Sequence, residues 1–179
     1  EHFFWQELPF VYRTHEKPDP EKMTKLGIFI RNFGYHIKNN QEEIHPKELQ
    51  KLLSKIEDTP EEALISRLTL RSMKQAKYTI DCTGHFGLAC QYYCHFTSPI
   101  RRYPDLVIHR IIKEFINYGV CEKRYSFLKR LVSEAAKRSS ETELIAMDAE
   151  RDADDMKKAE YMQNHIGEIF IGTISSVTN

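Results

Sequence analysis

The residues best suited to chemistry in this chain lie between positions 92 and 105. This stretch holds two adjacent arginines, Arg101 and Arg102, three residues after Ser98-Pro99. Serine is a favoured N-cap and proline a favoured first helical residue, so we expect a helix to begin here. The free backbone N–H groups of a helix start bind phosphate, and guanidinium groups bind it in a bidentate manner. The stretch therefore predicts an anion-binding site.

The side chains around the two arginines indicate what kind of anion this is. Cations at a helix start are disfavoured by the helix dipole, which indicates that something negative binds nearby. Phosphate-binding groups beside flat rings are typical of sites for single-stranded nucleic acid. The rings in question are Tyr92, Tyr93, His95, Phe96 and Tyr103.

The spacing of charges in the expected helix suggests how one arginine is oriented. Asp105 follows Arg101 by four residues, which allows an ion pair that directs the guanidinium toward a phosphate. We expect His109 to be a partner of Asp105. The alternative is structural: a capped helix whose arginines pair with carboxylates of the same protein, with a surface pair worth only ~0.3–0.5 kcal/mol.

A longer string around these residues resembles the signature of a known family. The strings HFGLA at 85–89 and HFTSPIRRYPDLVIHR at 95–110 are similar to the catalytic-domain motif of the ribonuclease II/ribonuclease R family, most of all to its bacterial ribonuclease R members. Three further segments agree. They are PFVYRTHE at 9–16, AERD at 149–152, and GEIFIGTI at 167–174, which looks like the opening strand of an OB-type RNA-binding domain.

The resemblance implies a processive 3′-to-5′ exoribonuclease that hydrolyses single-stranded RNA to nucleoside 5′-monophosphates. In this family the motif arginine, here Arg101, contacts the phosphate near the scissile bond, so Arg101 is the expected catalytic residue. Magnesium ions would be held by an upstream aspartate cluster that nothing here resembles, so we expect no metal ligands and no activity of this piece alone. The expected substrate contacts are Arg102, Tyr93, His95, Ser98, Tyr103, Asp105 and Glu150. Arg102 is alternatively a structural contact, and Glu150 a plain surface carboxylate.

Charge and cysteine content limit the class of protein. The 26 basic and 26 acidic residues cancel, which argues against a generic polyanion binder. Basic residues nevertheless predominate over 98–113 and acidic ones over 139–168, as in a protein with a basic groove, although an acidic stretch is also typical of a solvated helix face. No apolar run is long enough to span a membrane. The four cysteines form no CxxC pair, and we expect reduced, mostly buried thiols in the cytoplasm.

The pattern of apolar residues and punctuating residues predicts an α+β fold dominated by helices, with a few short antiparallel strands. Capping boxes are expected at Thr59–Glu62 and Ser140–Glu143, and residues 1–7 and 38–43 read as a helix end and a polar loop. The expected helices cover 20–33, 46–56, 59–71, 99–119, 125–137 and 140–165, and the expected strands 9–15, 76–82, 85–93 and 169–177.

We interpret the chain as two parts of a larger enzyme. Residues 1–166 form the C-terminal part of an RNB catalytic domain, and residues 167–179 the truncated start of the OB-type domain. Two other functions stay open, a non-catalytic RNA-binding module and a helical protein-interaction domain that uses its acidic helix. The parent protein is expected to be a monomer, with artificial self-association of the fragment through an exposed apolar face.

Overall fold

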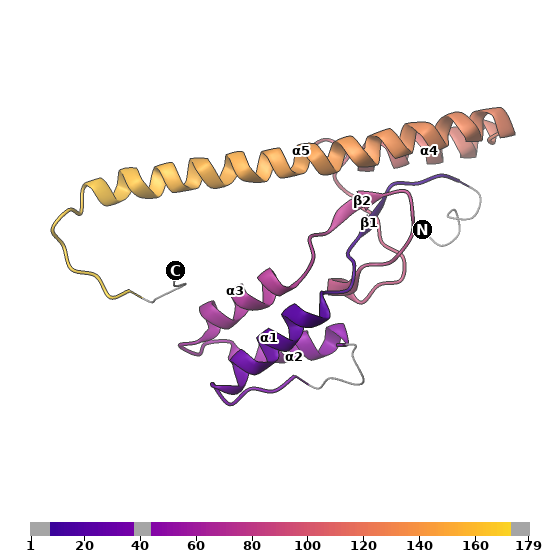
Figure 1. Ribbon diagram of the computed structural model, residues 1–179. Coiled ribbons are helices and arrows are strands. Elements are labelled where there is room, and N and C mark those ends of the chain that lie inside the picture. The colour runs from indigo at the N-terminus through magenta and orange to yellow at the C-terminus, as the bar shows by residue number, and fades with distance from the viewer. Residues whose placement is uncertain (1–7, 38–43, 173–179) are drawn as a thin grey trace. The chain divides into compact units, whose positions relative to one another are not determined.

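The computed structural model describes residues 8–37 and 44–172, and in them the fold is helix-dominated α+β, as predicted (Figure 1). The contacts between Cα atoms divide the chain into two units, 1–139 and 140–179. The helix end expected at 1–7 and the loop expected at 38–43 lie outside the described residues. The elements are β1 (Tyr12–Thr14), α1 (Pro20–Arg31), α2 (Pro46–Ile56), α3 (Glu62–Ser72), β2 (Lys77–Thr79), a 3-10 turn (Phe86–Leu88), α4 (Tyr103–Tyr118) and α5 (Glu122–Gln163).

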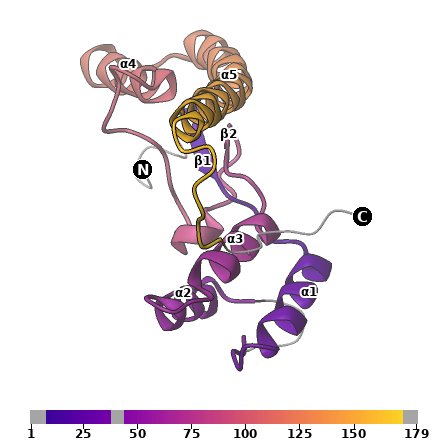
Figure 2. The ribbon, with the colours of Figure 1, turned by 90° about the vertical axis from the view of Figure 1, so that its left-hand side faces the viewer.

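Helices α1, α2 and α3 gather into one cluster (Figures 1 and 2). The Asp19 carboxylate caps α1 by accepting hydrogen bonds from the backbone N–H groups of Glu21 and Lys22, at 2.8 and 3.4 Å. A histidine ring, that of His45, caps α2 in the same manner. One apolar face of each helix is buried in a common core made of Met23, Leu26, Ile30, Leu49, Leu52, Ile56, Ile65 and Phe86.

A second core holds the segment that leads to the predicted site. Strands β1 and β2 pair antiparallel, with Arg13 opposite Tyr78. In α4 (Tyr103–Tyr118), Val107, Ile108 and Ile111 are buried in this core, whereas Ile116 is 69% exposed. The buried members of this core are Leu8, Phe10, Val11, Tyr12, Tyr78, Cys94, Val107, Ile108, Ile111, Leu128, Val132, Ala135 and Ala136.

At one end of the sheet, Lys74 and the first residue of β2, Lys77, both bind the carboxylate of Glu16, with Nζ–O distances of 2.8 and 2.6 Å. The hydrogen bonds and the charges of these two lysines lower the pKa of Glu16 to about 2. These contacts add a link between the end of β1 and the β2 segment.

The structure corrects two helix starts. Helix α4 begins at Tyr103 and not at Ser98-Pro99, because Pro104 takes the proline position of the first turn. Helix α3 begins at Glu62 without a side-chain cap, so the capping box predicted at 59–62 is wrong. There the Thr59 hydroxyl donates to the Ile56 carbonyl, and the Glu62 carboxylate accepts from the Asp58 N–H.

Helix α5 also differs from the prediction, because it runs unbroken for 42 residues through the predicted boundary. The expected N-cap Ser140 lies in mid-helix. The sequence from Glu122 to Gln163 contains neither glycine nor proline, and a serine alone costs too little to stop a growing helix.

Two predicted strands are not strands in the structure. Residues 85–93 contain the 3-10 turn, because the chain turns through positive φ at Gly84 and Ala89. After α5 the chain turns at Gly167, with φ of +94°, and residues 169–172 are not in a strand. The rest of the strand predicted at 169–177 lies outside the described residues. The predicted domain boundary at 166/167 stays a prediction.

The three-helix core gives a direct test of the fold. Ile65 on α3 is fully buried, whereas Leu70 on the same helix is 67% exposed. We expect Ile65→Ala to lower the free energy of unfolding by about 2–5 kcal/mol, because it opens a cavity in the core. Leu70→Ala should change it by less than about 0.5 kcal/mol. Urea denaturation measures both values, and equal losses would contradict the assigned core.

Candidate nucleic-acid interface

The chain makes a tight turn from Ser98 to Arg102 immediately before α4. The backbone N–H groups of Arg101 and Arg102 both donate to the Ser98 carbonyl, at 3.3 and 3.0 Å. Ser98 is thus the first residue of a turn and not the helix N-cap that the sequence predicted. Its own N–H donates to the carboxylate of Asp105, at 2.8 Å. The first residue of the turn is therefore attached to the first turn of α4.

Asp105 is fully buried, and one of its oxygens makes all of its described hydrogen bonds. Oδ2 accepts from the Ser98 N–H and from Nη2 and Nε of Arg102, at 2.8, 2.8 and 3.2 Å. The predicted ion pair between Asp105 and Arg101 is wrong, because the neighbouring Arg102 takes the carboxylate. In this arrangement Asp105 holds the two ends of the turn. Arg102 makes a structural contact, which was the alternative to a substrate contact in the sequence analysis.

Arg101 occupies the outer side of the same turn. Its side chain is exposed, and within residues 8–37 and 44–172 no hydrogen bond or ion pair engages its guanidinium. The preceding Ile100 is 99% exposed. Because arginine keeps its positive charge at every physiological pH, the turn presents a permanent cation to the solvent. Two adjacent arginines thus differ in kind: Arg102 is neutralised within the protein, and Arg101 is available to an external anion.

Tyr93 and His95 belong to a row of edge-to-face ring contacts, which we call the ring ladder. Its members, in order of contact, are His15, His85, Tyr93, His95 and Tyr78, with ring centroids 5.0 to 5.8 Å apart. A 2.9 Å hydrogen bond joins the Tyr78 hydroxyl to the His95 ring, and the Arg13 guanidinium lies 4.6 Å from the Tyr78 centroid. The ladder connects the segment before the turn to β1 and β2.

Sequence reasoning missed the partners that β1 and β2 contribute to this ladder. Arg13 and His15 lie in the string PFVYRTHE, and His85 begins HFGLA, so each was quoted in a family motif without a role. The pairing of two three-residue strands places Arg13 opposite Tyr78, and an isolated bridge pairs His15 with His85. Such short elements leave almost no periodicity to read.

Backbone hydrogen bonds fix the orientation of two ladder histidines. Nδ1 of His15 accepts from the Gly87 N–H at 3.0 Å, and Nδ1 of His85 accepts from the Leu88 N–H at 3.3 Å. A ring nitrogen that accepts is unprotonated, so the proton of each neutral ring is on Nε2. Burial, together with the charges of His15 and Arg13, lowers the pKa of His85. A side chain at Gly87 would meet the His15 ring at 3.0 Å.

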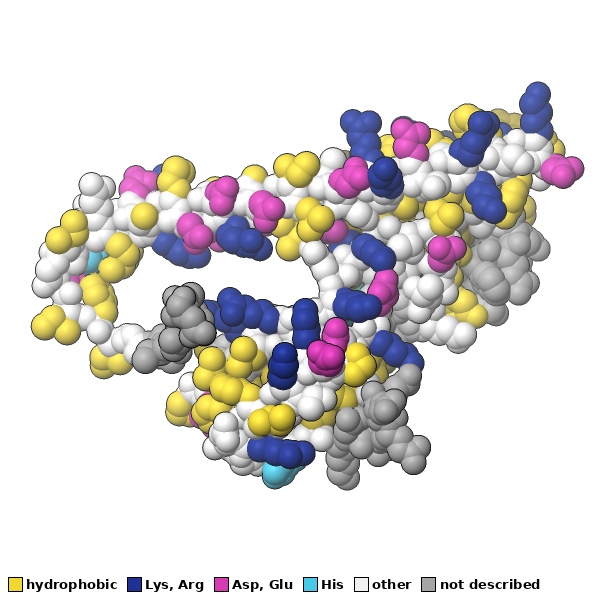
Figure 3. Space-filling model, viewed as in Figure 1, with side chains coloured by type: hydrophobic (Ala, Val, Ile, Leu, Met, Phe, Trp, Pro, Cys, Tyr) yellow, Lys and Arg dark blue, Asp and Glu magenta, His cyan; other side chains and the backbone are white. Residues whose placement is uncertain are grey.

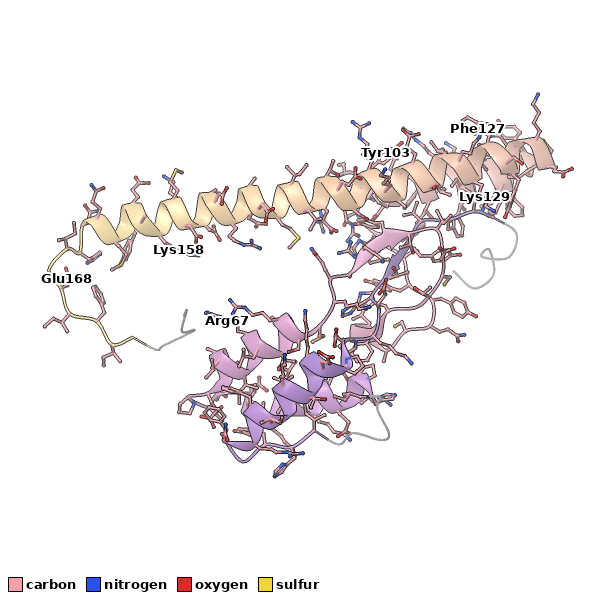
Figure 4. All side chains as sticks on the ribbon, viewed as in Figure 1. Arg67, Tyr103, Phe127, Lys129, Lys158 and Glu168 are labelled. Carbon is pink, nitrogen blue, oxygen red and sulfur yellow. The ribbon has the colours of Figure 1, made fainter. Side chains whose placement is uncertain are left out.

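His109 contacts Phe96 and not Asp105, which corrects the predicted pairing. Nε2 of His109 lies 2.8 Å from the Phe96 carbonyl oxygen, and the two rings stack at 4.2 Å with an interplanar angle of 13°. Phe96 is 42% exposed, and Tyr103, labelled in Figure 4 at the start of α4, is 49% exposed. Two accessible rings therefore flank the Arg101 turn along the chain, one on each side.

The acidic stretch of the second unit is a solvated helix surface. Glu150 is exposed on α5, and the neighbouring charges form exposed i,i+3 pairs such as Arg151–Asp148 and Lys158–Asp155. Figure 3 shows acidic, basic and hydrophobic side chains interspersed along this part of α5. The pattern agrees with the interpretation of this acidic stretch as a solvated helix face.

Metal ligands and thiols contribute little to the described site. In the part of the chain that the structure describes, no three His, Cys, Asp or Glu side chains come close enough to hold a metal ion, so the described residues do not fit a magnesium site. The four cysteines are not joined in disulfides, but only Cys94 is buried, and Cys90 and Cys121 are exposed, contrary to the expectation of mostly buried thiols. None of the described helices has the length and apolar character needed to cross a membrane.

Comparison with known proteins identifies relatives along almost the whole chain. The model of the RNB domain matches residues 1–118. The chain is 44% identical over 180 residues to ribonuclease R 1 of Lactococcus lactis and 45% identical over 174 residues to ribonuclease R of Thermotoga maritima. It covers 99% and 96% of its own length in these matches, but only 22% and 24% of theirs. The chain thus spans about a quarter of the curated relatives that it matches.

Two solved structures show the same fold. Mycoplasma genitalium RNase R, in complex with ribose-methylated single-stranded RNA, matches with a TM-score of 0.86 at 27% identity, over 97% of this chain and 27% of that one. Yeast Ssd1, described as a pseudonuclease, matches with a TM-score of 0.60 at 32% identity, over 73% of this chain and 16% of that one.

The two adjacent arginines give a matched pair of variants. We expect Arg102→Ala to lower the free energy of unfolding by about 2–4 kcal/mol, because it leaves the buried Asp105 carboxylate without its counterion. Arg101→Ala removes an exposed side chain that pairs with none of the described residues, and it should change the value by less than about 0.5 kcal/mol. Chemical denaturation of both variants checks this, and a greater loss for Arg101→Ala would refute the assignment of partners.

The ring ladder predicts a pH dependence. Because the pKa of His85 is lowered from its usual 6.5 in the folded state, the unfolded chain binds a proton more readily. Stability should therefore fall as the pH drops below about 6.5. We expect His85→Asn to make the melting temperature less dependent on pH between about 6.5 and 5. His36→Asn, at an exposed imidazole outside the ladder, is the control. An unchanged slope in His85→Asn would contradict the prediction.

Proposed function

The chain belongs to the RNB-domain family, and from this premise we propose that it is part of a 3′-to-5′ exoribonuclease that hydrolyses single-stranded RNA to nucleoside 5′-monophosphates. The observation that carries the proposal is the state of Arg101, an exposed guanidinium that has no partner among residues 8–37 and 44–172. It lies on a turn fixed by backbone and carboxylate hydrogen bonds. The names of the relatives support the same activity, and one relative has been solved with single-stranded RNA.

In the proposed reaction Arg101 contacts the phosphate at the bond to be cleaved. Hydrolysis of a phosphodiester builds negative charge on the phosphoryl oxygens, and a cation already in position stabilises that charge without reorganising. A guanidinium can bind two of these oxygens at once, which an ammonium group cannot do with the same geometry. Because backbone hydrogen bonds close the turn before RNA binds, little freedom of its backbone is lost on contact.

The remaining parts of the proposal concern the RNA path and the metal. The exposed rings of Phe96 and Tyr103 are suited to stacking on bases, which contributes about 1–3 kcal/mol per base without sequence preference. The magnesium that the family implies would supply the activation of water, and residues outside the described part would have to bind it. The proposal also places Glu150 near the RNA path and the protein in the cytoplasm. The parent protein is proposed to be a monomer.

A second candidate function is an RNA-binding module without nuclease activity. The specific observation in its favour is the match to yeast Ssd1, because a protein described as a pseudonuclease shares this fold. The two candidates differ in what the complete gene product does with RNA. An enzyme shortens RNA from its 3′ end, whereas a module of the second kind binds RNA and leaves its length unchanged.

The test is the single-turnover rate at which the complete gene product trims the 3′ end of a labelled single-stranded RNA. We expect Arg101→Ala to lower this rate about 10²–10³-fold, as the loss of a preorganised charge-stabilising group does in other enzymes. Arg101→Lys should retain an intermediate rate, because it keeps the charge and loses the planar fork.

Arg110→Ala is the matched control, since it removes an exposed arginine from α4 outside the turn. An unchanged rate in Arg101→Ala would refute the catalytic assignment. Binding of RNA without trimming by the wild-type protein would favour the second candidate.

A further inference from the structure

We propose that Asp105 is a positioning residue, which fixes the direction in which Arg101 presents its guanidinium. The inference rests on the proposed function, because it takes the phosphate contact of Arg101 as given. Asp105 acts at a distance from any ligand, since its side chain is fully buried. It acts through Ser98 and Arg102, the first and last residues of the turn that carries Arg101.

The turn has few other contacts to hold it. Ile100 and Arg101 at its outer side are exposed, so side-chain packing does not fix their position. Within the turn, two backbone hydrogen bonds to the Ser98 carbonyl close the chain on itself. The last residue of the turn, Arg102, is the N-cap of α4 and fixes one end of the turn to the helix. The Asp105 carboxylate fixes the other end, because it accepts the hydrogen bond of the Ser98 N–H.

Helix α4, which carries Asp105, is itself fixed by the core. Asp105 lies in its first turn, where the helix dipole favours a negative charge. Val107 and Ile108, which follow directly, are 2% and 1% exposed in the core. Because the core fixes α4, the Asp105 carboxylate has a fixed position, and its hydrogen bonds fix the turn relative to the core. Interactions of buried charges are strong only when their geometry is good. The three hydrogen bonds to Oδ2, at 2.8, 3.2 and 2.8 Å, therefore restrict Ser98 and Arg102 to a narrow range of positions.

Arg102 completes the arrangement as the counterion. A buried carboxylate is destabilising unless a positive charge and hydrogen-bond donors compensate it. Arg102 supplies both, because its Nε and Nη2 donate to Oδ2, the same oxygen that accepts from the Ser98 N–H. The two arginines of the motif thus have different roles. Arg102 holds the turn in place, and Arg101 contacts the substrate.

The second oxygen of Asp105 shows which substitution is conservative. Oδ1 is buried and, among the described residues, has no hydrogen-bond partner. An asparagine can therefore place its carbonyl oxygen at the Oδ2 position and its amide group at the Oδ1 position without displacing a described bond. Asp105→Asn keeps the acceptor and loses the charge, whereas Asp105→Ala loses both.

The test measures kcat and KM for trimming of single-stranded RNA by the complete gene product. We expect Asp105→Ala to lower kcat about 10²-fold, the size of effect that a misplacement of about 1 Å produces, with KM changed less than about threefold. Asp105→Asn should recover much of the loss. In an Arg101→Ala background, Asp105→Ala should lower kcat by no more than about twofold, because the group that it positions is gone. Asp155→Ala, at an exposed aspartate of α5, is the control.

Three results would overturn the inference while leaving the proposed function intact: a folded Asp105→Ala protein with full kcat, losses that multiply in the double variant, or no recovery with asparagine. If Asp105→Ala does not fold by circular dichroism, Arg102→Lys and Asp105→Asn decide instead. Both should then lower kcat about three- to tenfold through the loosened turn. Full kcat in both would overturn the inference. A full rate in Arg101→Ala would instead overturn the proposed function.

Discussion

The site depends on one buried carboxylate. Asp105 accepts three hydrogen bonds on a single oxygen, and these bonds connect the start of α4, the backbone of Ser98 and the side chain of Arg102. Burying a charge without compensation costs several kcal/mol, so the carboxylate needs both its counterion and the N–H group of the turn. Because Arg102 satisfies this internal requirement, Arg101 is left without a partner among the described residues. The need of the buried Asp105 for a counterion thus occupies Arg102 and leaves the Arg101 guanidinium available to bind a substrate.

The remainder of the first unit supports this arrangement in two ways. The core beneath α4 fixes the helix that carries Asp105. The ring ladder ties the segment at 93–95 to β1 and β2, and the hydrogen bond between Tyr78 and His95 holds the last two rings together. The chain enters the turn from the ladder and leaves it into α4. Both ends of the turn are therefore attached to ordered structure, and both attachments use residues of the family motif.

Much of this could be predicted from the sequence, and the failures have clear physical causes. The start of the helix predicted at 20–33 and the end of the helix predicted at 99–119 agree with α1 and α4, because capping and chain termination depend on neighbouring residues alone. The choice between Arg101 and Arg102 as partner of Asp105 could not be made, since both i,i+3 and i,i+4 spacings allow a pair. The start of α4 was misplaced for a related reason: two proline-containing segments, Ser98-Pro99 and Tyr103-Pro104, each resemble a helix start. The ladder depends on contacts between distant segments, which local patterns do not reveal.

The central claim is that Arg101 binds the phosphate of the terminal linkage, and it can be tested by removing the charge from the RNA. The measurement is the affinity of the complete gene product, without divalent ions, for an oligonucleotide with either a natural or a neutral methylphosphonate linkage at its 3′ end. The account predicts that the wild-type protein binds the neutral oligonucleotide more weakly and that Arg101→Ala binds both equally. If Arg101→Ala distinguishes the two oligonucleotides as strongly as the wild type does, then Arg101 does not contact that phosphate and the account is wrong.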